Sequence, residues 1–252
     1  MQIHVEKDAQ RMGAAAASQI AKRLRDAIEQ NGEARLLLST GASQFETLEA
    51  LCREEVEWSR VTAFHLDEYL GIPTTHPASF CRYMRERFAS RVPIREMVYV
   101  DTTGDAQTKI QQLTQRLREK AIDVGVIGIG ENGHIAFNDP PANFESKAAY
   151  HIVRLDDACK KQQVGEGWFA SPADVPECAV SMTPCQIMQC RSIVSPVPGL
   201  RKARAICAMM NAKERTETIP ATLLKEHPDF ALYLDEESAS QWMNNLSNGA
   251  AT

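Results

Sequence analysis

The residues best suited to chemistry lie in one glycine-rich stretch, residues 127–141, which reads IGIGENGHIAFNDPP. Its single histidine, His134, has Asn132 two positions before it and Asp139 five positions after it. An imidazole titrates near neutral pH and can therefore give or take a proton, with a polar group contacting it from either side. A lone histidine beside a strand is more often structural. Three glycines, an amide, a carboxylate and a Pro-Pro pair close to His134 favour an active-site loop instead.

A buried strand is expected to lead into this loop. Residues 122–127 are mostly apolar and partly β-branched, which is typical of a strand in a core. Gly130 and Gly133 then allow turns that residues with a Cβ resist. In an open α/β sheet the carboxyl ends of the strands are where ligands bind, so we assign both glycines to a substrate-binding loop.

A second polar loop follows the apolar run at residues 34–38 and enters a helical pattern. It is made of small residues, namely Ser39, Thr40, Gly41, Ala42 and Ser43. Unpaired backbone N–H groups and the helix dipole at such a position favour a phosphate. The loop lacks the Gly-x-x-x-x-Gly-Lys-Ser/Thr pattern, so a nucleotide hydrolase is not indicated. Because Ser and Thr are also common helix caps, an anion site and a plain cap explain this segment equally well.

Two adjacent carboxylates, Asp67 and Glu68, form a third polar loop after the strand expected at residues 61–66. They would repel each other inside one pocket, so we expect one to face the pocket and the other to be bound elsewhere. A carboxylate in the pocket could act as a general base, and Glu68 is grouped with the substrate-binding loop. Asp-Glu pairs are also common on protein surfaces, which leaves a surface position open.

A basic turn follows the strand expected at residues 192–197. Gly199 leads into Arg201 and Lys202, close to the start of a helix. Cations at a helix start oppose the helix dipole and need a compensating anion, which a bound phosphate would supply. An ordinary basic surface turn is the alternative.

The whole chain alternates between helical and strand-like patterns. Helices are expected at residues 8–30, 45–54, 79–90, 106–120 and 202–211, and strands at residues 34–38, 61–66, 97–100, 122–127, 192–197 and 231–234. Strands that alternate with helices predict a mainly parallel sheet with helices on both faces. There is no internal repeat or linker, so residues 1–252 are expected to form a single α/β domain.

The composition excludes several classes of protein. The net charge of −5 and the lack of a basic run argue against a nucleic-acid partner. No run of about 18 apolar residues exists, so no membrane span is expected, and the polar first residues do not form a signal peptide. The seven cysteines are scattered without a Cys-x-x-Cys pair, which supports neither a zinc site nor a disulfide framework. Reduced thiols and a cytoplasmic location are therefore expected.

Three motifs in order along the chain resemble the glucosamine-6-phosphate deaminase (isomerase) family. They are STGAS at residues 39–43, LDEYLGIP at residues 66–73 with HPASF at residues 76–80, and GIGENGHIAFN at residues 128–138. The similarity runs from about residue 10 to about residue 240. The related 6-phosphogluconolactonases carry Gly-His-Thr and a Ser-Leu-Phe-Pro type run, where this chain has IAFN after its Gly-His. The resemblance implies a modified Rossmann-like α/β fold, which both groups share.

The resemblance assigns roles to the polar residues outside the histidine loop. Residues 40–43 match the family's phosphate loop, and Lys202 matches a lysine that helps to hold the phosphate. Asp67 matches the aspartate that moves a proton between C1 and C2. The implied reaction converts glucosamine 6-phosphate and water to fructose 6-phosphate and ammonia, through aldose–ketose isomerisation and loss of the C2 amine. The implied partner is a small-molecule sugar phosphate, and these steps require no metal or organic cofactor.

His134 matches the histidine that assists opening of the sugar ring, with Asn132 and Asp139 in the places of its partners. The better-known enzymes have an aspartate and a glutamate there, so this histidine has one charged partner rather than two. They also carry a substrate-binding arginine before a Phe-Phe pair, whereas residues 165–169 read GEGWF here. We therefore identify the chain as a divergent member of the family.

The sequence leaves two alternatives open. A phosphosugar lactonase or another phosphosugar isomerase shares this fold, although residues 135–138 disfavour it. A non-catalytic sugar-phosphate sensor is favoured by Asn132 and the missing arginine. The sequence does not decide between a monomer and a homo-oligomer, between gluco and galacto substrates, or whether the activity is under allosteric control.

Overall fold

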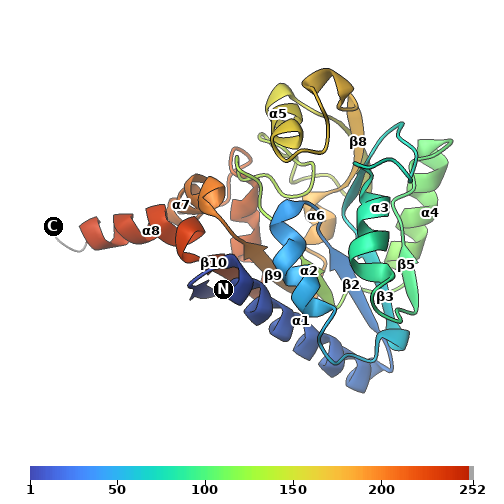
Figure 1. Ribbon diagram of the computed structural model, residues 1–252, viewed down its shortest axis with the longest axis horizontal. Helices are drawn as coiled ribbons and strands as arrows, with labels where there is room; N and C mark the ends of the chain where they lie inside the picture. The colour runs from blue at the N-terminus through green and yellow to red at the C-terminus, as the bar shows by residue number, and fades with distance from the viewer. Residues whose placement is uncertain (250–252) are drawn as a thin grey trace.

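Seven parallel strands form the central sheet of the computed structural model, which describes residues 1–249 without the side chains of residues 158 and 247–249 (Figure 1). Their order across the sheet is β1-β10-β9-β6-β2-β3-β5, and every neighbouring pair is parallel. The strands are β1 (Gln2–Glu6), β2 (Ala34–Leu38), β3 (Val61–His65), β5 (Glu96–Val98), β6 (Val124–Val126), β9 (Ser192–Val197) and β10 (Phe230–Asp235). The predicted mainly parallel sheet is therefore confirmed.

The α-helices alternate with these strands along most of the chain. They are α1 (Ala9–Asn31), α2 (Phe45–Leu51), α3 (Phe80–Met84), α4 (Ala106–Arg118), α5 (Asp157–Gly165), α6 (Pro184–Ile187), α7 (Ala203–Asn211) and α8 (Glu236–Gly249). A π-helical turn, Arg85–Ala89, continues α3, so the helix predicted at residues 79–90 is present in two parts. Within residues 1–249, no helix is long and apolar enough to cross a membrane.

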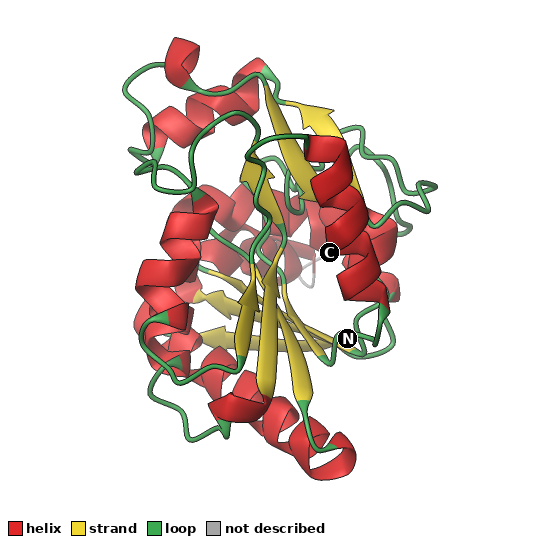
Figure 2. Cartoon of the chain, turned by 90° about the vertical axis from the view of Figure 1, so that its right-hand side faces the viewer, coloured by secondary structure: helices red, strands yellow, loops and turns green. Residues whose placement is uncertain are grey.

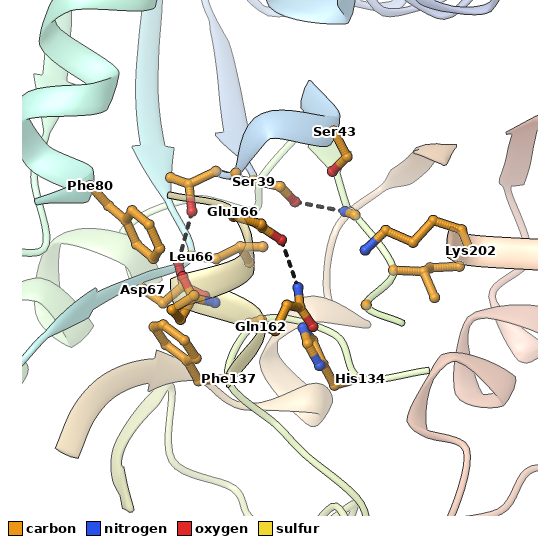
Figure 3. Close-up of a pocket in the computed structure, with 17 residues that line it drawn as sticks. Ser39, Ser43, Leu66, Asp67, Phe80, His134, Phe137, Gln162, Glu166 and Lys202 are labelled. Carbon is orange, nitrogen blue, oxygen red and sulfur yellow. Dashed lines mark hydrogen bonds between the residues drawn. The ribbon is translucent and has the colours of Figure 1, made fainter. Parts of the chain in front are cut away.

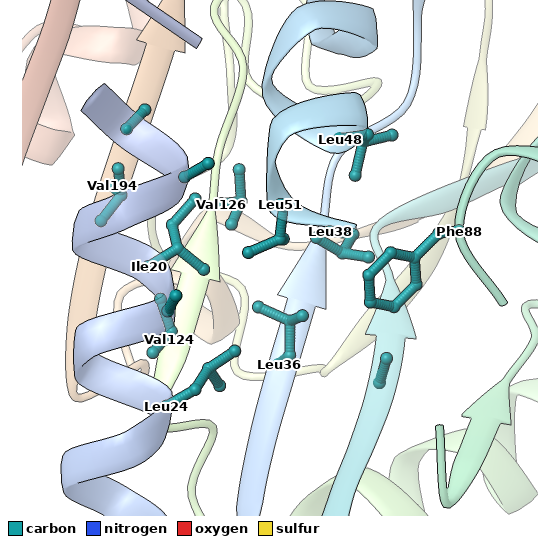
Figure 4. Close-up of a cluster of buried hydrophobic side chains, with 14 of the residues drawn as sticks. Ile20, Leu24, Leu36, Leu38, Leu48, Leu51, Phe88, Val124, Val126 and Val194 are labelled. Atoms are coloured by element: carbon teal, nitrogen blue, oxygen red, sulfur yellow. The ribbon is translucent and has the colours of Figure 1, made fainter. Parts of the chain in front are cut away.

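Helices cover both faces of the central sheet, as the sequence predicts. Leu36 and Leu38 of β2 belong to an apolar cluster with α1 and α2 on one face (Figure 4). Leu37, between them, belongs to a second cluster with residues of α4, α7 and α8. Successive side chains of a strand point to opposite faces, so a strand covered on both sides is mostly apolar. Every residue of β2 is accordingly buried.

A second, smaller sheet continues beyond the carboxyl end of the central sheet (Figure 2). Its antiparallel strands, in spatial order, are β4 (Asp67–Tyr69), β8 (Cys178–Met182) and β7 (Tyr150–Arg154). β4 follows β3 after the single residue Leu66, so the chain passes directly from one sheet into the other. The sequence predicts a loop at Asp67 and Glu68. This prediction is wrong, because pairing with β8 holds the backbone there as a strand.

Candidate active site

A cavity opens at the carboxyl ends of β2, β3 and β6, where the chain leaves the central sheet (Figure 3). The space between its lining atoms, including the open mouth, is about 530 Å³. Most residues singled out from the sequence line it, namely Ser39, Thr40, Gly41, Ser43, Asp67, Gly130, His134 and Lys202. The other predicted residues do not line it, namely Ala42, Glu68, Asn132, Gly133 and Asp139. Polar loops that are far apart in the sequence thus meet in one place, as expected at strand ends of an open α/β sheet.

Ser39 fixes the loop that follows β2. Its hydroxyl donates to the carbonyl oxygen of Val126 at 2.7 Å and accepts from the backbone N–H of Gly128 at 2.7 Å. These bonds join the end of β2 to the loop after β6. Tyr83 of α3 donates its hydroxyl hydrogen to the carbonyl oxygen of Gly41 at 2.9 Å and holds the loop from the other side. The hydroxyl of Ser39 therefore shapes the loop and is already engaged within the protein.

Lys202 supplies positive charge to the cavity. It ends a short 3-10 turn before α7, and its side chain is only 7 % exposed. Burial lowers the pKa of its ammonium group, and the charges of Glu166 and Glu131 act in the opposite direction. No hydrogen bond or ion pair joins this ammonium group to another residue in the described part of the chain. A nearly buried cation without such a partner is suited to an anion that enters the cavity.

The two adjacent carboxylates of β4 have different surroundings, as the sequence predicts. Asp67 lines the cavity, whereas Glu68 does not. The Glu68 carboxylate accepts four hydrogen bonds, from the Ser79 hydroxyl and from the backbone N–H groups of Tyr69, Phe80 and Cys81. Glu68 therefore joins β4 to the start of α3. Its grouping with the substrate-binding loop is corrected, because its oxygens are already bound inside the protein.

Asp67 has a carboxyl group that is difficult to ionise. Burial raises its pKa to about 8, and the neighbouring charge of Glu68 acts in the same direction. The Thr40 hydroxyl, 3.5 Å from Oδ1, opposes this rise in pKa through a long hydrogen bond. The group consequently titrates just above neutral pH. A carboxylate with this pKa is a stronger base than an ordinary one, which suits proton transfer.

His134 is held by the two neighbours that the sequence singles out. Asn132 Oδ1 lies 2.8 Å from the Nδ1 atom of His134, and Asp139 Oδ1 lies 3.1 Å from it. Asn132 also donates from Nδ2 to Asp139 Oδ1 at 3.0 Å and accepts from the backbone N–H of His134 at 3.0 Å. Both oxygens that face Nδ1 are acceptors. The neutral imidazole therefore carries its proton on Nδ1 and leaves Nε2 as an acceptor.

Asp139 remains ionised beside this histidine. Burial acts to raise the pKa of its carboxyl group, but hydrogen bonds from His134 and Asn132 and the charge of His134 outweigh burial. The pKa of Asp139 is consequently lower than its ordinary value. A carboxylate at 3.1 Å can stabilise the imidazolium form of the ring, whereas the amide of Asn132 orients the ring without adding charge.

Two glycines allow the imidazole to lie where it does. A Cβ on Gly130 would come within 2.2 Å of His134 Cε1, so a side chain there would displace the ring. The backbone N–H of Gly130 donates to the carbonyl oxygen of His134 at 2.9 Å and closes the loop. Gly133 has a φ of +85°, a left-handed conformation that residues with a Cβ rarely adopt. Gly133 thus shapes the turn without lining the cavity.

Further residues, which the sequence analysis missed, complete the cavity. One group is apolar, namely Leu66, Phe80 and Phe137. The other group is polar and comes from α5 and the residue after it, namely Gln162, Gln163 and Glu166. Gln162 and Gln163 precede Glu166 by four and three positions, the helical spacing that places side chains on one face. The helix itself was not predicted, because its sequence DACKKQQVG has no apolar stripe.

A Rossmann-like sheet with a polar cavity at the carboxyl ends of its strands defines an α/β protein with a small-molecule site. The chain belongs to the family of glucosamine-6-phosphate isomerases and 6-phosphogluconolactonases, which it matches over residues 7–232. It is 35% identical over 204 residues to a glucosamine-6-phosphate deaminase of Exiguobacterium sibiricum, covering 81% of this chain and 79% of that protein. It is 33% identical over 211 residues to the glucosamine-6-phosphate deaminase of Streptococcus pneumoniae, covering 83% and 88%.

Solved structures show the same fold. A monomeric glucosamine-6-phosphate deaminase is similar with a TM-score of 0.86 at 27% identity, covering 96% of this chain and 100% of that one. The 6-phosphogluconolactonase of Trypanosoma brucei is similar with a TM-score of 0.78 at 18% identity, covering 95% and 97%. At that identity the second likeness concerns the fold alone. The predicted family and the Rossmann-like fold are both confirmed.

Proposed function

We propose that this chain is an amino-sugar-phosphate deaminase/isomerase that converts glucosamine 6-phosphate and water to fructose 6-phosphate and ammonia. One observation carries the proposal. A single cavity contains a nearly buried lysine beside a small-residue loop, a buried carboxyl group, and an imidazole held by an amide and a carboxylate. The similarity to glucosamine-6-phosphate deaminases over most of the chain supports the same substrate.

Ring opening is the first step, and we assign it to His134. The closed sugar must lose the proton of its C1 hydroxyl and gain one at its ring oxygen. The unprotonated Nε2 of the neutral imidazole can take the first proton and deliver it to the ring oxygen. Asp139 stabilises the imidazolium that exists between these two transfers, and Asn132 keeps the ring in place.

Proton transfer between carbons is the second step, and we assign it to Asp67. Its ionised form removes the proton from C2 of the open-chain aldose, which gives an enolamine, and returns the proton to C1. The product carries an iminium group at C2, to which water adds before ammonia leaves. The raised pKa of Asp67 strengthens the base. An ammonium group on C2 of the bound substrate would favour the ionised carboxylate.

Phosphate binding positions the sugar for both steps. We assign it to Thr40, Gly41 and Ser43 of the loop after β2, together with Lys202. The phosphate is remote from the bonds that change, so its binding energy serves mainly to hold C1 and C2 near the reactive groups. The seven cysteines are free thiols, which supports a reducing compartment, so we place the enzyme in the cytoplasm.

A turnover assay tests the proposal. The purified protein is incubated with glucosamine 6-phosphate, and ammonia and fructose 6-phosphate are each measured with a coupled enzyme. Both products should form in equal amounts, and Asp67→Asn, which keeps the shape of the side chain, serves as the matched inactive control. Binding of the substrate without either product would overturn the deaminase and leave a sensor. Hydrolysis of 6-phosphogluconolactone without ammonia release would assign the chain to the lactonases.

A further inference from the structure

Glu166 is a carboxylate that lies against the loop proposed to bind phosphate. It follows α5 directly and lines the same cavity as Gly41 and Lys202 (Figure 3). Its Oε2 atom is 3.8 Å from the position that a Cβ on Gly41 would occupy. Its charge also acts on the pKa of Lys202. Glu166 takes no part in the proposed ring opening or proton transfer. A negative charge beside a phosphate-binding loop nevertheless affects which anions can bind there.

Two hydrogen bonds fix this carboxylate in place. The amide Nε2 of Gln162 donates to Oε1 of Glu166 at 2.8 Å, and the indole Nε1 of Trp168 donates to Oε2 at 3.0 Å. Both donors are neutral, so neither cancels the charge. Each carboxylate oxygen has a second acceptor position. Glu166 is therefore an oriented acceptor that can take one more hydrogen bond from a bound molecule.

The charges around the loop do not suit a fully ionised phosphate. Lys202 is the single lysine or arginine among the described residues that line the cavity. A phosphate ester carries about −1.5 to −2 charges at neutral pH, and its second pKa is about 6. A dianion beside the fixed Glu166 carboxylate would be repelled, and no N–H or O–H of Glu166 could bind it. A monoanion carries a P–OH group, which can donate a hydrogen bond to that carboxylate.

We propose that Glu166 makes the anion site selective for a phosphate that still carries one proton, by accepting a hydrogen bond from its P–OH group. The ligand class is the monoanion of a phosphate monoester, and sulfate esters are excluded because they have no proton to donate. Lys202 balances the single negative charge of the ligand. This inference rests on the proposed phosphate loop and names the protonation state of the group that binds there.

Other ionisable groups also face the cavity, so a test of this proposal must leave their protonation states unchanged. Asp67, His134 and Lys202 line it, and Tyr83 donates to Gly41 from behind the loop. A pH titration would change several of these groups together with the ligand. A comparison of two anions at one pH holds these groups constant and changes only the ligand: at pH 6 inorganic phosphate is mainly a monoanion that can donate a proton, whereas sulfate is a dianion that cannot.

The test is calorimetric titration of the purified protein with inorganic phosphate and with inorganic sulfate at pH 6. We expect the wild type to bind phosphate at least about tenfold more tightly, because sulfate leaves a desolvated carboxylate facing an anion. Glu166→Gln should bind both anions within about threefold, mainly because sulfate binding improves. Trp168→Phe is the matched control. It removes one hydrogen bond to the carboxylate but keeps the charge, so it should retain the preference for phosphate.

Three results would overturn the inference. They are equal binding of both anions by the wild type, an unchanged preference in Glu166→Gln, and binding of neither anion. A further variant, Lys202→Ala, separates this inference from the proposed function, since it should weaken both anions together. If the wild type discriminates between the anions but releases no ammonia from glucosamine 6-phosphate, the deaminase proposal fails and the role of Glu166 stands. If Glu166→Gln raises KM for glucosamine 6-phosphate while the preference for phosphate is retained, the carboxylate binds the amine instead.

Discussion

Replacing Asp67 by asparagine should change how the stability of the protein depends on pH. The side chain is 5 % exposed, and its pKa is raised from 3.8 to about 8, first by burial and then by the charge of Glu68. The shift is about 4 pKa units, and each unit corresponds to about 1.36 kcal/mol. Ionising Asp67 in the folded protein is therefore about 5–6 kcal/mol less favourable than ionising it in the unfolded chain.

The sign of the effect follows from this raised pKa. Below about pH 4 both states carry the proton, and the stabilising contribution of the protonated group is fully present. As the pH rises, the unfolded chain releases the proton first, so the contribution declines and is lost above about pH 8. The folded and unfolded states differ in the protonation of Asp67 over about 4 pH units, and about 3 of these lie between pH 5 and pH 9. Asparagine has no such proton, so Asp67→Asn should gain about 4 kcal/mol in free energy of unfolding relative to the wild type over this range.

Urea unfolding of both proteins at pH 5, 7 and 9 measures this difference. Asp101→Asn is the matched control, because hydrogen bonds from Lys109 and Thr103 outweigh burial and hold the pKa of Asp101 below its ordinary value. Asp101 is consequently ionised in both states above pH 5, and its replacement should lower stability by a similar amount at each pH. Parallel curves for the wild type and Asp67→Asn would refute the raised pKa, and with it the argument for a strengthened base.

Four activity predictions follow from the site. Asp67→Asn should lower turnover by about 10²–10⁴-fold and abolish exchange of the C2 proton with deuterated solvent while the substrate still binds, since the general base is lost. In the wild type, kcat/KM should fall as the pH drops below about 8, because the protonated Asp67 cannot accept a proton. Lys202→Ala should raise KM at least as much as it lowers kcat, as expected for a contact remote from the bond changes. Asp139→Asn should reduce turnover more severely than Asn132→Asp, because it removes the carboxylate that can stabilise the imidazolium 3.1 Å away, whereas Asn132→Asp keeps that charge.

Each of these predictions can fail in a defined way. Exchange of the C2 proton at the wild-type rate in Asp67→Asn would assign the base to another residue. Unaltered kinetics in Lys202→Ala would place the phosphate elsewhere. Wild-type turnover in Asp139→Asn would remove the proposed role of this carboxylate beside His134. A flat kcat/KM profile between pH 6 and pH 8 would show that Asp67 does not limit the reaction.

The central sheet was predictable because its strands carry local signals. The runs at residues 34–38, 61–66 and 192–197 are mostly apolar, and each contains a strand whose residues are all buried. The smaller sheet lacked such signals. β4 contains two adjacent carboxylates, which are poor strand formers, and it becomes a strand only through pairing with β8. That pairing joins residues more than 100 positions apart, which local periodicity cannot report.

Some residues of the site could also be predicted from the sequence, and others could not. Asp67 and His134 could be found because each follows an apolar run, and the ends of parallel strands meet at one edge of a sheet. The different surroundings of Asp67 and Glu68 could also be predicted, since two carboxylates in one small cavity repel each other. Glu166 was not foreseeable. Its position depends on how α5 lies against the cavity, and α5 has a polar sequence without a stripe that would reveal its orientation.

The cavity is built from two separate parts of the chain. The groups proposed to move protons lie on β4 and on the loop after β6, whereas Gln162, Gln163 and Glu166 lie on the connection between β7 and β8. Cys159 of this connection interacts with Asp139, and Gln163 accepts a hydrogen bond from Tyr69 of β4. A library limited to Gln162 and Glu166 would alter which molecules enter while these supports stay in place. The same division offers natural selection a route to new substrates through a short segment, without rebuilding the catalytic base. Directed evolution of substrate range should therefore begin at Gln162 and Glu166.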